Sequence, residues 1–296
     1  FDFFKYLKRL PKKFLFVDLS KKDSLSFLLQ RLMIFKGGKR VVITITNYPM
    51  VRNASVKTFL FQKFSIKNLI FLIKKLGRIF ITITLDNKLC PPPNYHFVCG
   101  TEAYKEAAKL SKKTEIIKAH CLNYDNYLLL KNKHPNEQYS DSIVYLDQDY
   151  EGNYTYSIEG EVHPVTKEAH WNSLNLFFEK LSKKFNKKII IAAHPRRDRN
   201  VKINTPHEVI FEETANLIKN SFLIIGHDSI SLEYAIMFDK PVMFVTTNEI
   251  EKDKQSMWIK LFAEEFGKKP INIDNAIDLD DKKILSFDKK VYNNYL

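Results

Sequence analysis

The sequence predicts an α/β fold in which parallel, doubly wound sheets form two domains. Short apolar or β-branched runs alternate with stretches of helical periodicity along most of the chain, which is typical of parallel sheets with helices on both faces. The 296 residues, 45% of them hydrophobic, are enough for two separate cores. The polar stretch 131–142 is the candidate linker, which gives domains of residues 1–135 and 136–296.

The net charge of +13 is unevenly distributed along the chain. Residues 1–140 hold 26 Lys and Arg against 9 Asp and Glu, whereas residues 141–296 hold 21 against 25. A basic half beside a mildly acidic half indicates two domains with different partners. The basic half suits anionic lipid, another polyanion or nucleic acid, although a solvated lysine-rich surface accounts for the same count.

In the first domain, β-branched and aliphatic runs favour strands, and apolar residues spaced three or four apart favour helices. Strands are expected at residues 14–17, 41–46, 79–84, 95–99 and 115–119. Helices are expected at 24–35, 55–76, 102–110 and 124–130, with Ser24 and Thr101 as N-caps. The stretch 55–76 mixes aromatic residues with lysines. We expect it to pack on the sheet, and a position on a membrane surface is the alternative.

In the second domain the same alternation continues. Strands are expected at residues 143–146, 189–193, 222–226 and 271–273, with further strands ending at Phe211 and Thr247. Helices are expected at 169–185, 215–219, 230–238 and 251–266. The C-terminal tail is a candidate to pack back onto the first domain.

Two polar segments follow two of these strands, and ligands of open parallel sheets bind beyond the carboxyl ends of strands. The first is His194-Pro195-Arg196-Arg197, in which the proline fixes the loop while imidazole and guanidinium groups suit a phosphate. The second is His227-Asp228-Ser229-Ile230-Ser231, where Asp228 or Ser229 is expected to cap a helix whose N-terminus attracts anions. A solvated basic loop and a well-capped helix are the plainer readings. Together, on neighbouring strand–helix units, the segments predict one phosphate site.

Three further residues of the second domain are candidates to contact the same ligand. Glu233, near the first turn of the 230–238 helix, is a candidate acceptor for ribose hydroxyls. Glu212 and Thr214, after the strand ending at Phe211, are candidates to border a base pocket. The alternative is that Glu233 is a surface carboxylate that only stabilises the positive end of the helix dipole.

The chain lacks the motifs of several enzyme classes. There is no GxGxxG, no GxxxxGK[ST], no HExxH and no GxSxG. The three cysteines have no CxxC spacing, which argues against a zinc site and for a reducing, cytoplasmic location. The longest apolar run, residues 69–73, is far shorter than the roughly 18 residues a membrane span needs. We expect no metal and no cofactor.

The second half resembles the C-terminal domain of GT-B-fold glycosyltransferases, and most nearly the bacterial CMP-sugar transferases of surface polysaccharide synthesis, of the sialyl and Kdo type. The matching segments are residues 191–196, which contain the His-Pro pair, 224–235 and 240–247. The resemblance implies two Rossmann-like domains facing a cleft and a nucleotide-sugar donor. It also implies that His194 contacts the donor phosphate and that Ser229 and Ser231 line the same site.

The catalytic base is not given by the resemblance, because the acidic pair followed by glycine of sialyltransferases is absent from the first half. By position at strand ends, Asp86 and then Asp18 are the candidates. The basic domain is expected to hold a glycan or lipid-linked acceptor, with peripheral contact to the inner face of an anionic membrane.

Three alternatives remain open. The first is a glycerophosphate transferase that uses CDP-glycerol, because such enzymes have a helix start comparable to residues 227–231. An epimerase of the same fold acts on UDP-sugars without an acceptor. A non-enzymatic binder of nucleic acid or another polyanion would use the basic residues and aromatics of 57–78, although no nucleic-acid motif appears and nucleic acid is not expected.

Overall fold

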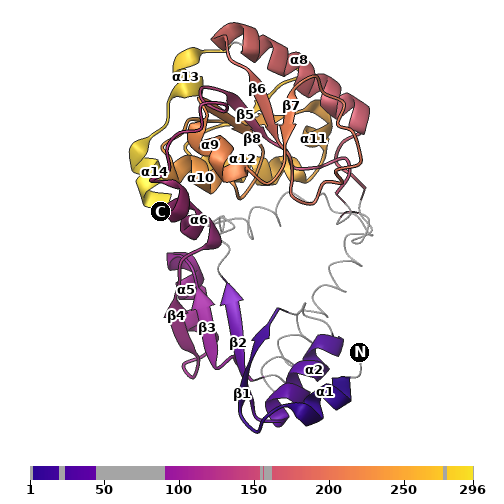
Figure 1. Ribbon diagram of the computed structural model, residues 1–296, viewed down its shortest axis with the longest axis vertical. Helices are drawn as coiled ribbons and strands as arrows, with labels where there is room; N and C mark the ends of the chain where they lie inside the picture. Colours follow the sequence, from indigo (N-terminus) through magenta and orange to yellow (C-terminus); the bar gives the residue numbers. More distant parts are fainter. Residues whose placement is uncertain are drawn as a thin grey trace, which may run out of the picture. The chain divides into compact units, whose positions relative to one another are not determined.

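The computed structural model describes residues 3–19, 24–44, 91–153, 156, 162–275 and 279–295 (Figure 1). The chain divides into two compact units, Phe1–Leu122 and Asn123–Leu296. The division comes earlier than the boundary expected between residues 135 and 136, so the helix at 122–130 belongs almost entirely to the second unit. The helix expected at 55–76, the strand expected at 79–84 and Asp86 lie outside the described residues.

The described part of the first unit is a parallel sheet with helices. Its strands are β1 (Phe14–Asp18), β2 (Gly38–Thr44), β3 (Tyr95–Val98) and β4 (Glu115–Lys118), in the order β1-β2-β3-β4. Its helices are α1 (Phe3–Arg9), α2 (Ser24–Phe35) and α5 (Thr101–Leu110). The paired strands all run parallel, so the turns that precede them share one edge of the sheet and the turns that follow them share the other.

The second unit contains a six-stranded parallel sheet. Its strands are β5 (Ile143–Leu146), β6 (Ile189–Ala192), β7 (Glu208–Ile210), β8 (Leu223–Gly226), β9 (Val242–Thr246) and β10 (Ile271–Asn272). Their order is β10-β9-β8-β5-β6-β7, which read from the other edge is the 3-2-1-4-5-6 order of a Rossmann sheet. The chain reverses direction across the sheet between β5 and β8. The predicted parallel α/β architecture is confirmed in both units.

Helices cover both faces of this sheet (Figure 1). The helices are α6 (Leu122–Leu130), α8 (Lys167–Phe185), α9 (Thr214–Asn220), α10 (Leu232–Met237), α11 (Asn248–Lys252), α12 (Gln255–Glu265), α13 (Asp281–Leu285) and α14 (Lys289–Tyr295). In β5, Ile143 and Tyr145 pack in the cluster with α8, whereas Val144 and Leu146 pack in the cluster with α10 and α12. Burial on both faces explains why these strands read as continuous apolar runs.

Several local predictions are corrected. Thr101 is the first residue of α5 rather than its cap, and the N-cap position is Gly100. The helix expected at 251–266 is two helices, α11 and α12, interrupted at Asp253. The C-terminal tail packs on its own unit, because Tyr292 of α14 is buried in the core and donates a hydrogen bond to the carbonyl of Lys240 at 2.9 Å.

Candidate functional site

The two polar segments lie at the same edge of the second sheet. His194-Pro195-Arg196-Arg197 follows β6 and His227-Asp228-Ser229-Ile230-Ser231 follows β8, and both strands pair with β5. The segments therefore flank the carboxyl end of β5, next to the point where the strand order reverses. This is where open α/β sheets bind their ligands.

The loop that follows β5 is hydrogen-bonded to both segments. On one side Asp147 accepts the backbone N–H of His194 at 3.2 Å. On the other side the hydroxyl of Tyr150 donates to Asp228 at 2.7 Å. The opposite oxygen of Asp228 accepts from Gln255 of α12 at 2.5 Å. Because one loop bonds to both segments, their separation is fixed by the fold.

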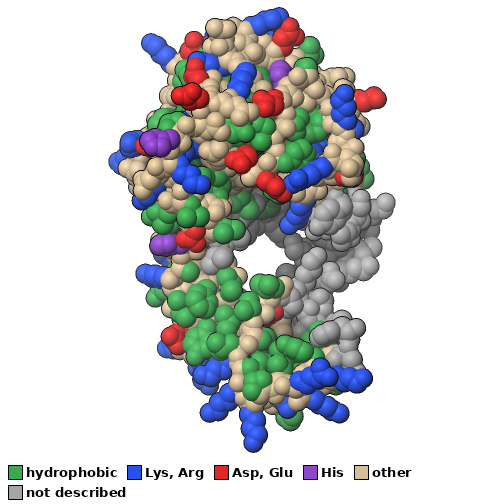
Figure 2. Space-filling model, in the orientation of Figure 1, with side chains coloured by type: hydrophobic (Ala, Val, Ile, Leu, Met, Phe, Trp, Pro, Cys, Tyr) green, Lys and Arg blue, Asp and Glu red, His purple; other side chains and the backbone are tan. Residues whose placement is uncertain are grey.

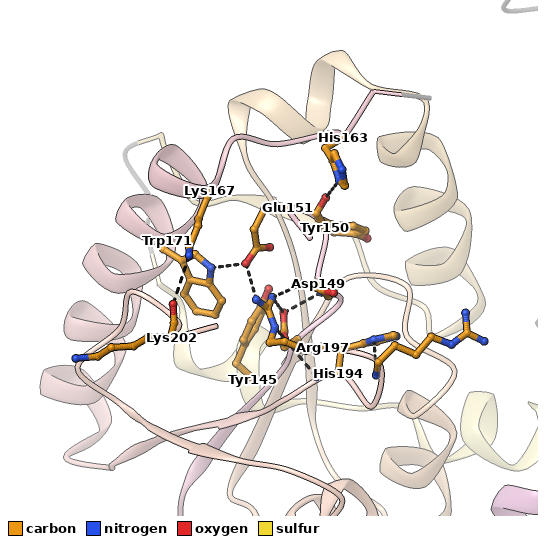
Figure 3. A network of polar contacts seen from close by, with 12 residues as sticks. Tyr145, Asp149, Tyr150, Glu151, His163, Lys167, Trp171, His194, Arg197 and Lys202 are labelled. Atoms are coloured by element: carbon orange, nitrogen blue, oxygen red, sulfur yellow. Dashed lines mark hydrogen bonds and ion pairs between the residues drawn. The ribbon is translucent and has the colours of Figure 1, made fainter. Parts of the chain in front are cut away.

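Arg197 lies in a buried cluster of carboxylates (Figure 3). Its guanidinium contacts Asp147 at 2.6 and 2.9 Å, Asp149 at 3.1 Å and Glu151 at 2.8 Å, and Trp171 donates to Glu151 at 2.7 Å. Burial alone would lower the pKa of Arg197, but the hydrogen bonds and charges of Asp147 and Glu151 raise it. Its charge is thus directed at three carboxylates inside the protein rather than at the surface.

His194 is half-buried, and its hydrogen bonding fixes the position of its proton. The backbone N–H of Arg196 donates to Nδ1 at 3.2 Å, so Nδ1 carries the lone pair and Nε2 carries the hydrogen. Burial lowers the pKa of His194, with a further lowering by Arg196 and Arg197 that Asp147 opposes, so the ring is neutral at pH 7. Pro195 and Arg196 beside it are exposed. The Nε2–H and the Arg196 guanidinium are donors suited to a phosphate.

His227, expected at the donor site, is a core residue. It is fully buried, Nδ1 donates to the carbonyl of Val245 at 2.7 Å, and Nε2 accepts from the hydroxyl of Tyr145 at 3.0 Å. Burial, with a smaller contribution from the nearby His170 that the hydrogen bond to Val245 opposes, lowers its pKa to about 3. The ring therefore joins the ends of β5, β8 and β9 in its neutral form.

The helix start expected at residue 230 is a turn that leads into a short helix. Leu232, Glu233 and Tyr234 donate their backbone N–H groups to the carbonyls of Ser229, Ile230 and Ser231. Of the two expected caps, Ser229 caps this turn, since its Oγ accepts the N–H of Ser231 at 3.3 Å. Asp228 is buried by its contacts to Tyr150 and Gln255. No side chain caps α10 itself, whose N-cap position is Ser231. The groups that this turn presents are the half-buried hydroxyls of Ser229 and Ser231.

The remaining donor-side candidates have different environments. Glu233 is 3% exposed and accepts a hydrogen bond from Asn123 of α6 at 2.7 Å. Glu212 is exposed, has a left-handed backbone (φ 63°) and pairs with Arg199. Thr214 begins α9 after β7, the strand beside β6, so it lies at the same edge of the sheet.

Sequence reasoning missed the acidic loop after β5. Asp147, Asp149 and Glu151 alternate directly after a buried strand, and that spacing was the available signal. Burial raises the pKa of Asp149 to about 6; Arg197 opposes the shift, while Asp147 and Glu151 add to it. Beside them His170 is 1% exposed, and its Nδ1 and the Glu151 Oε2 have no hydrogen-bond partner in the described structure.

In the first unit, Asp18 is at the end of β1, as expected. Its Oδ2 accepts from Arg40 Nε at 2.8 Å and contacts a second guanidinium nitrogen at 2.7 Å, and the Asp18 side chain is 7% exposed.

A cavity of about 260 Å³ opens at the carboxyl ends of β3 and β4 of the first unit. It is lined by Val98, Gly100, Thr101, Tyr104, Lys118 and Ala119.

No described group of three or more His, Cys, Asp or Glu side chains is arranged to hold a metal ion. Within the same residues, no helix is both long enough and apolar enough to cross a membrane.

Comparison with known proteins gives similarities at low identity only. No protein-family model matches the chain, and no curated protein matches it. Among solved structures, the glycotransferase of kitacinnamycin is 11% identical with a TM-score of 0.42, over 92% of this chain and 65% of that chain. Spinosyn forosaminyltransferase SpnP is 9% identical with a TM-score of 0.42, over 99% and 68%. SnogD, a glycosyltransferase from Streptomyces nogalater, is 8% identical with a TM-score of 0.38, over 96% and 94%.

The chain thus spans about two thirds of the length of the first two of these proteins. Likeness at such identities and TM-scores carries no argument about activity. The class defined by the chain's own strands is a two-unit parallel α/β protein whose second sheet has the Rossmann order.

Proposed function

We propose that this chain is a glycosyltransferase that holds the phosphate of a nucleotide-activated sugar between His194 and the turn at Ser229. One observation carries the proposal. The two polar segments flank β5 at the carboxyl edge of a Rossmann-order sheet, and the loop after β5 is hydrogen-bonded to both.

The chemistry required is stabilisation of the phosphate charge that develops as the sugar leaves. The neutral His194 ring would donate from Nε2, and the exposed Arg196 would add a charged fork of donors. The hydroxyls of Ser229 and Ser231 would donate from the other side. Arg197, Asp228 and His227 support the site by holding the two segments, since their polar atoms are engaged inside the unit.

The donor we favour is a CMP-activated sugar, on the resemblance of residues 191–196 and 224–235 to the CMP-sugar transferases. Glu212 and Thr214 are proposed to border the nucleoside. Glu233 is proposed to accept hydrogen bonds from its ribose hydroxyls. The acceptor is proposed to be a glycan or a lipid-linked glycan on the basic first unit. Asp18 and Asp86 remain the proposed catalytic bases. To act as the base, Asp18 would have to break its ion pair with the guanidinium of Arg40, and Asp86 lies outside the described residues.

An activity assay with defined donors tests the proposal. The purified protein is incubated with CMP-, UDP- and GDP-sugars and with CDP-glycerol, with and without oligosaccharide acceptors, and released nucleotide and product mass are measured. We expect nucleotide release from a sugar donor, abolished by His194→Ala and retained by His207→Ala. His207 is a matched control because it is half-buried but precedes β7, at the opposite edge of the sheet.

The competing functions give different results in the same assay. Release of CMP from CDP-glycerol alone would assign a glycerophosphate transferase. An isomeric sugar formed from a nucleotide-sugar without acceptor or nucleotide release would assign an epimerase. Turnover of a sugar donor that is equal in the His194→Ala variant would reject the site.

A further inference from the structure

The amino edge of the first sheet, opposite to the edge where its strands end, gathers three connections. The C-termini of α1, α2 and α5 lead into β1, β2 and β4 there. Two of the turns are in contact, because a Cβ on Gly37 would lie 2.2 Å from the carbonyl oxygen of Lys12. Gly37 has a φ of 102°, a conformation that glycine adopts readily.

The three connecting segments carry only basic charges, and the acid nearest to them in sequence is the exposed Glu115 at the start of β4. Segments 8–13, 35–39 and 109–113 contain no Asp or Glu, and all of their charged side chains are exposed. We call the set the basic edge: Lys8, Arg9, Lys12, Lys13, Lys36, Lys39, Lys109, Lys112 and Lys113. Figure 2 shows Lys and Arg side chains gathered at the end of the first unit that carries α1, α2 and β1.

Two plainer explanations account for part of this pattern. Cations near helix C-termini are favoured by the helix dipole, and lysines are common on solvated surfaces. The dipole effect fades beyond the last helical turn, so it does not account for the absence of acids among residues 10–13 and 111–113. In the second unit exposed lysines are interspersed with acids, as in the pairs Lys183–Glu179 at 2.5 Å and Lys289–Asp239 at 3.1 Å. Residues 1–122 hold 24 Lys and Arg against 7 Asp and Glu, whereas residues 123–296 hold 23 against 27.

Apolar side chains project among these charges. Phe35, the last residue of α2, is 94% exposed and directly precedes Lys36. Leu15 of β1 is 64% exposed and is the strand partner of Lys39. An exposed aromatic side chain surrounded by lysines is suited to the boundary between headgroups and acyl chains of an anionic bilayer.

We propose that the basic edge lies on the surface of a bilayer of anionic phospholipid, with Phe35 inserted between the headgroups. Eight of the nine basic residues are lysines, whose compact charges suit a diffuse negative surface. Arginine forks would suit paired recognition of individual phosphates in a nucleic acid better. This attachment does not depend on the transferase proposal, since it uses no residue of the second unit.

Vesicle co-sedimentation tests the attachment. The full chain is mixed with vesicles of phosphatidylcholine alone, or of equal parts phosphatidylcholine and phosphatidylglycerol, at low and high salt. We expect binding only to the anionic vesicles and weaker binding in high salt. The triple variant Lys12→Glu, Lys13→Glu, Lys36→Glu should lower partitioning by at least about tenfold. The matched triple Lys180→Glu, Lys252→Glu, Lys260→Glu on exposed lysines of the second unit should change it by less than about twofold.

The aromatic contribution is tested separately. Phe35→Ser should lower binding by a factor that high salt does not remove, while Leu28→Ser on the same helix, 55% exposed, should not. Thermal melting checks that each variant is folded, and the corresponding Lys→Gln triple replaces the Glu triple if that one unfolds. Equal binding to both vesicle types, equal losses in the two triples, or binding to single-stranded RNA without binding to anionic vesicles would overturn the proposal.

Discussion

The guanidinium of Arg197 donates Nε and Nη2 to the carboxylate of Asp147, at 2.6 and 2.9 Å, across 50 positions of sequence. The pair joins the loop after β6 to the loop after β5. The same carboxylate accepts the N–H of His194. The location of His194 at the candidate site is therefore set by a buried ion pair, and changes to that pair have measurable consequences.

The variant Arg197→Met leaves three buried carboxylates without their cation. Because uncompensated buried charges are costly, we expect a loss of about 3–5 kcal/mol in the free energy of unfolding at pH 7. Denaturant unfolding measures it. Arg199→Met is the control: it removes the exposed pair with Glu212 and the contact of the guanidinium with the Phe211 ring, and it should cost less than about 1 kcal/mol. Equal losses in the two variants would contradict a structural role for Arg197.

Asp149→Asn should stabilise the protein at pH 8. Burial raises the pKa of Asp149 to about 6 from an ordinary value of 3.8, so the folded state binds more protons between these values. Stability attributable to this group therefore falls as pH rises through that window and stays lower above it. Removing the charge should gain about 1–3 kcal/mol at pH 8 and nothing near pH 4. The φ of 53° at Asp149 also suits asparagine.

The pH dependence of that gain is the diagnostic measurement. Unfolding free energies of the wild type and Asp149→Asn are compared across the acid range. A gain of the same size at every pH would show that backbone conformation, not charge, is responsible. A loss at pH 8 would mean that the ionised carboxylate stabilises Arg197 more than burial destabilises it.

His227 should make the protein acid-sensitive. Its pKa in the folded state is lowered to about 3 by burial, below the ordinary 6.5, so the unfolded state binds the extra proton between these values. Stability falls as pH falls from about 6.5, by about 1.4 kcal/mol per pH unit for this group. In His227→Phe the slope of unfolding free energy against pH should decrease by one proton. An unchanged slope would contradict the neutral, buried state of His227.

Much of this architecture could be predicted from the sequence, because strands buried on both faces leave continuous apolar runs such as Ile189-Ile190-Ile191-Ala192. That the segments at His194 and His227 share one edge follows from parallel strands alone. The break at Asp253 was missed, since the capping of α11 by Thr247 depends on how β9 ends.

Side-chain roles at the edge were harder to predict. His194 and His227 each follow an apolar strand, yet one faces the edge and the other is in the core. The difference arises from Tyr145 and Val245, which come from other strands and supply both hydrogen bonds to His227. Arg196 and Arg197 are adjacent in sequence, and only the location of Asp147, Asp149 and Glu151 decides which one is buried. Sequence periodicity contains no information about such contacts between distant segments.

Ligand binding at His194 should use the neutral ring. Its Nε2 carries the hydrogen and its Nδ1 accepts the N–H of Arg196, so a second proton would have to go on Nδ1 and break that hydrogen bond. Burial also lowers the pKa of His194 and keeps the ring neutral at pH 7. Titration calorimetry of CMP in two buffers of different ionisation enthalpy should therefore report the same proton uptake for the wild type and for His194→Ala. Uptake by the wild type that is absent in the variant would contradict a neutral His194 ring.

Calorimetric titration of CMP into the wild type, His194→Ala, Ser229→Ala and His207→Ala tests most directly whether the segments after β6 and β8 hold one phosphate. We predict binding by the wild type, a loss of about tenfold or more in affinity for His194→Ala and Ser229→Ala, and wild-type affinity for His207→Ala. Absence of CMP binding by the wild type, or unchanged affinity in both His194→Ala and Ser229→Ala, would contradict the account.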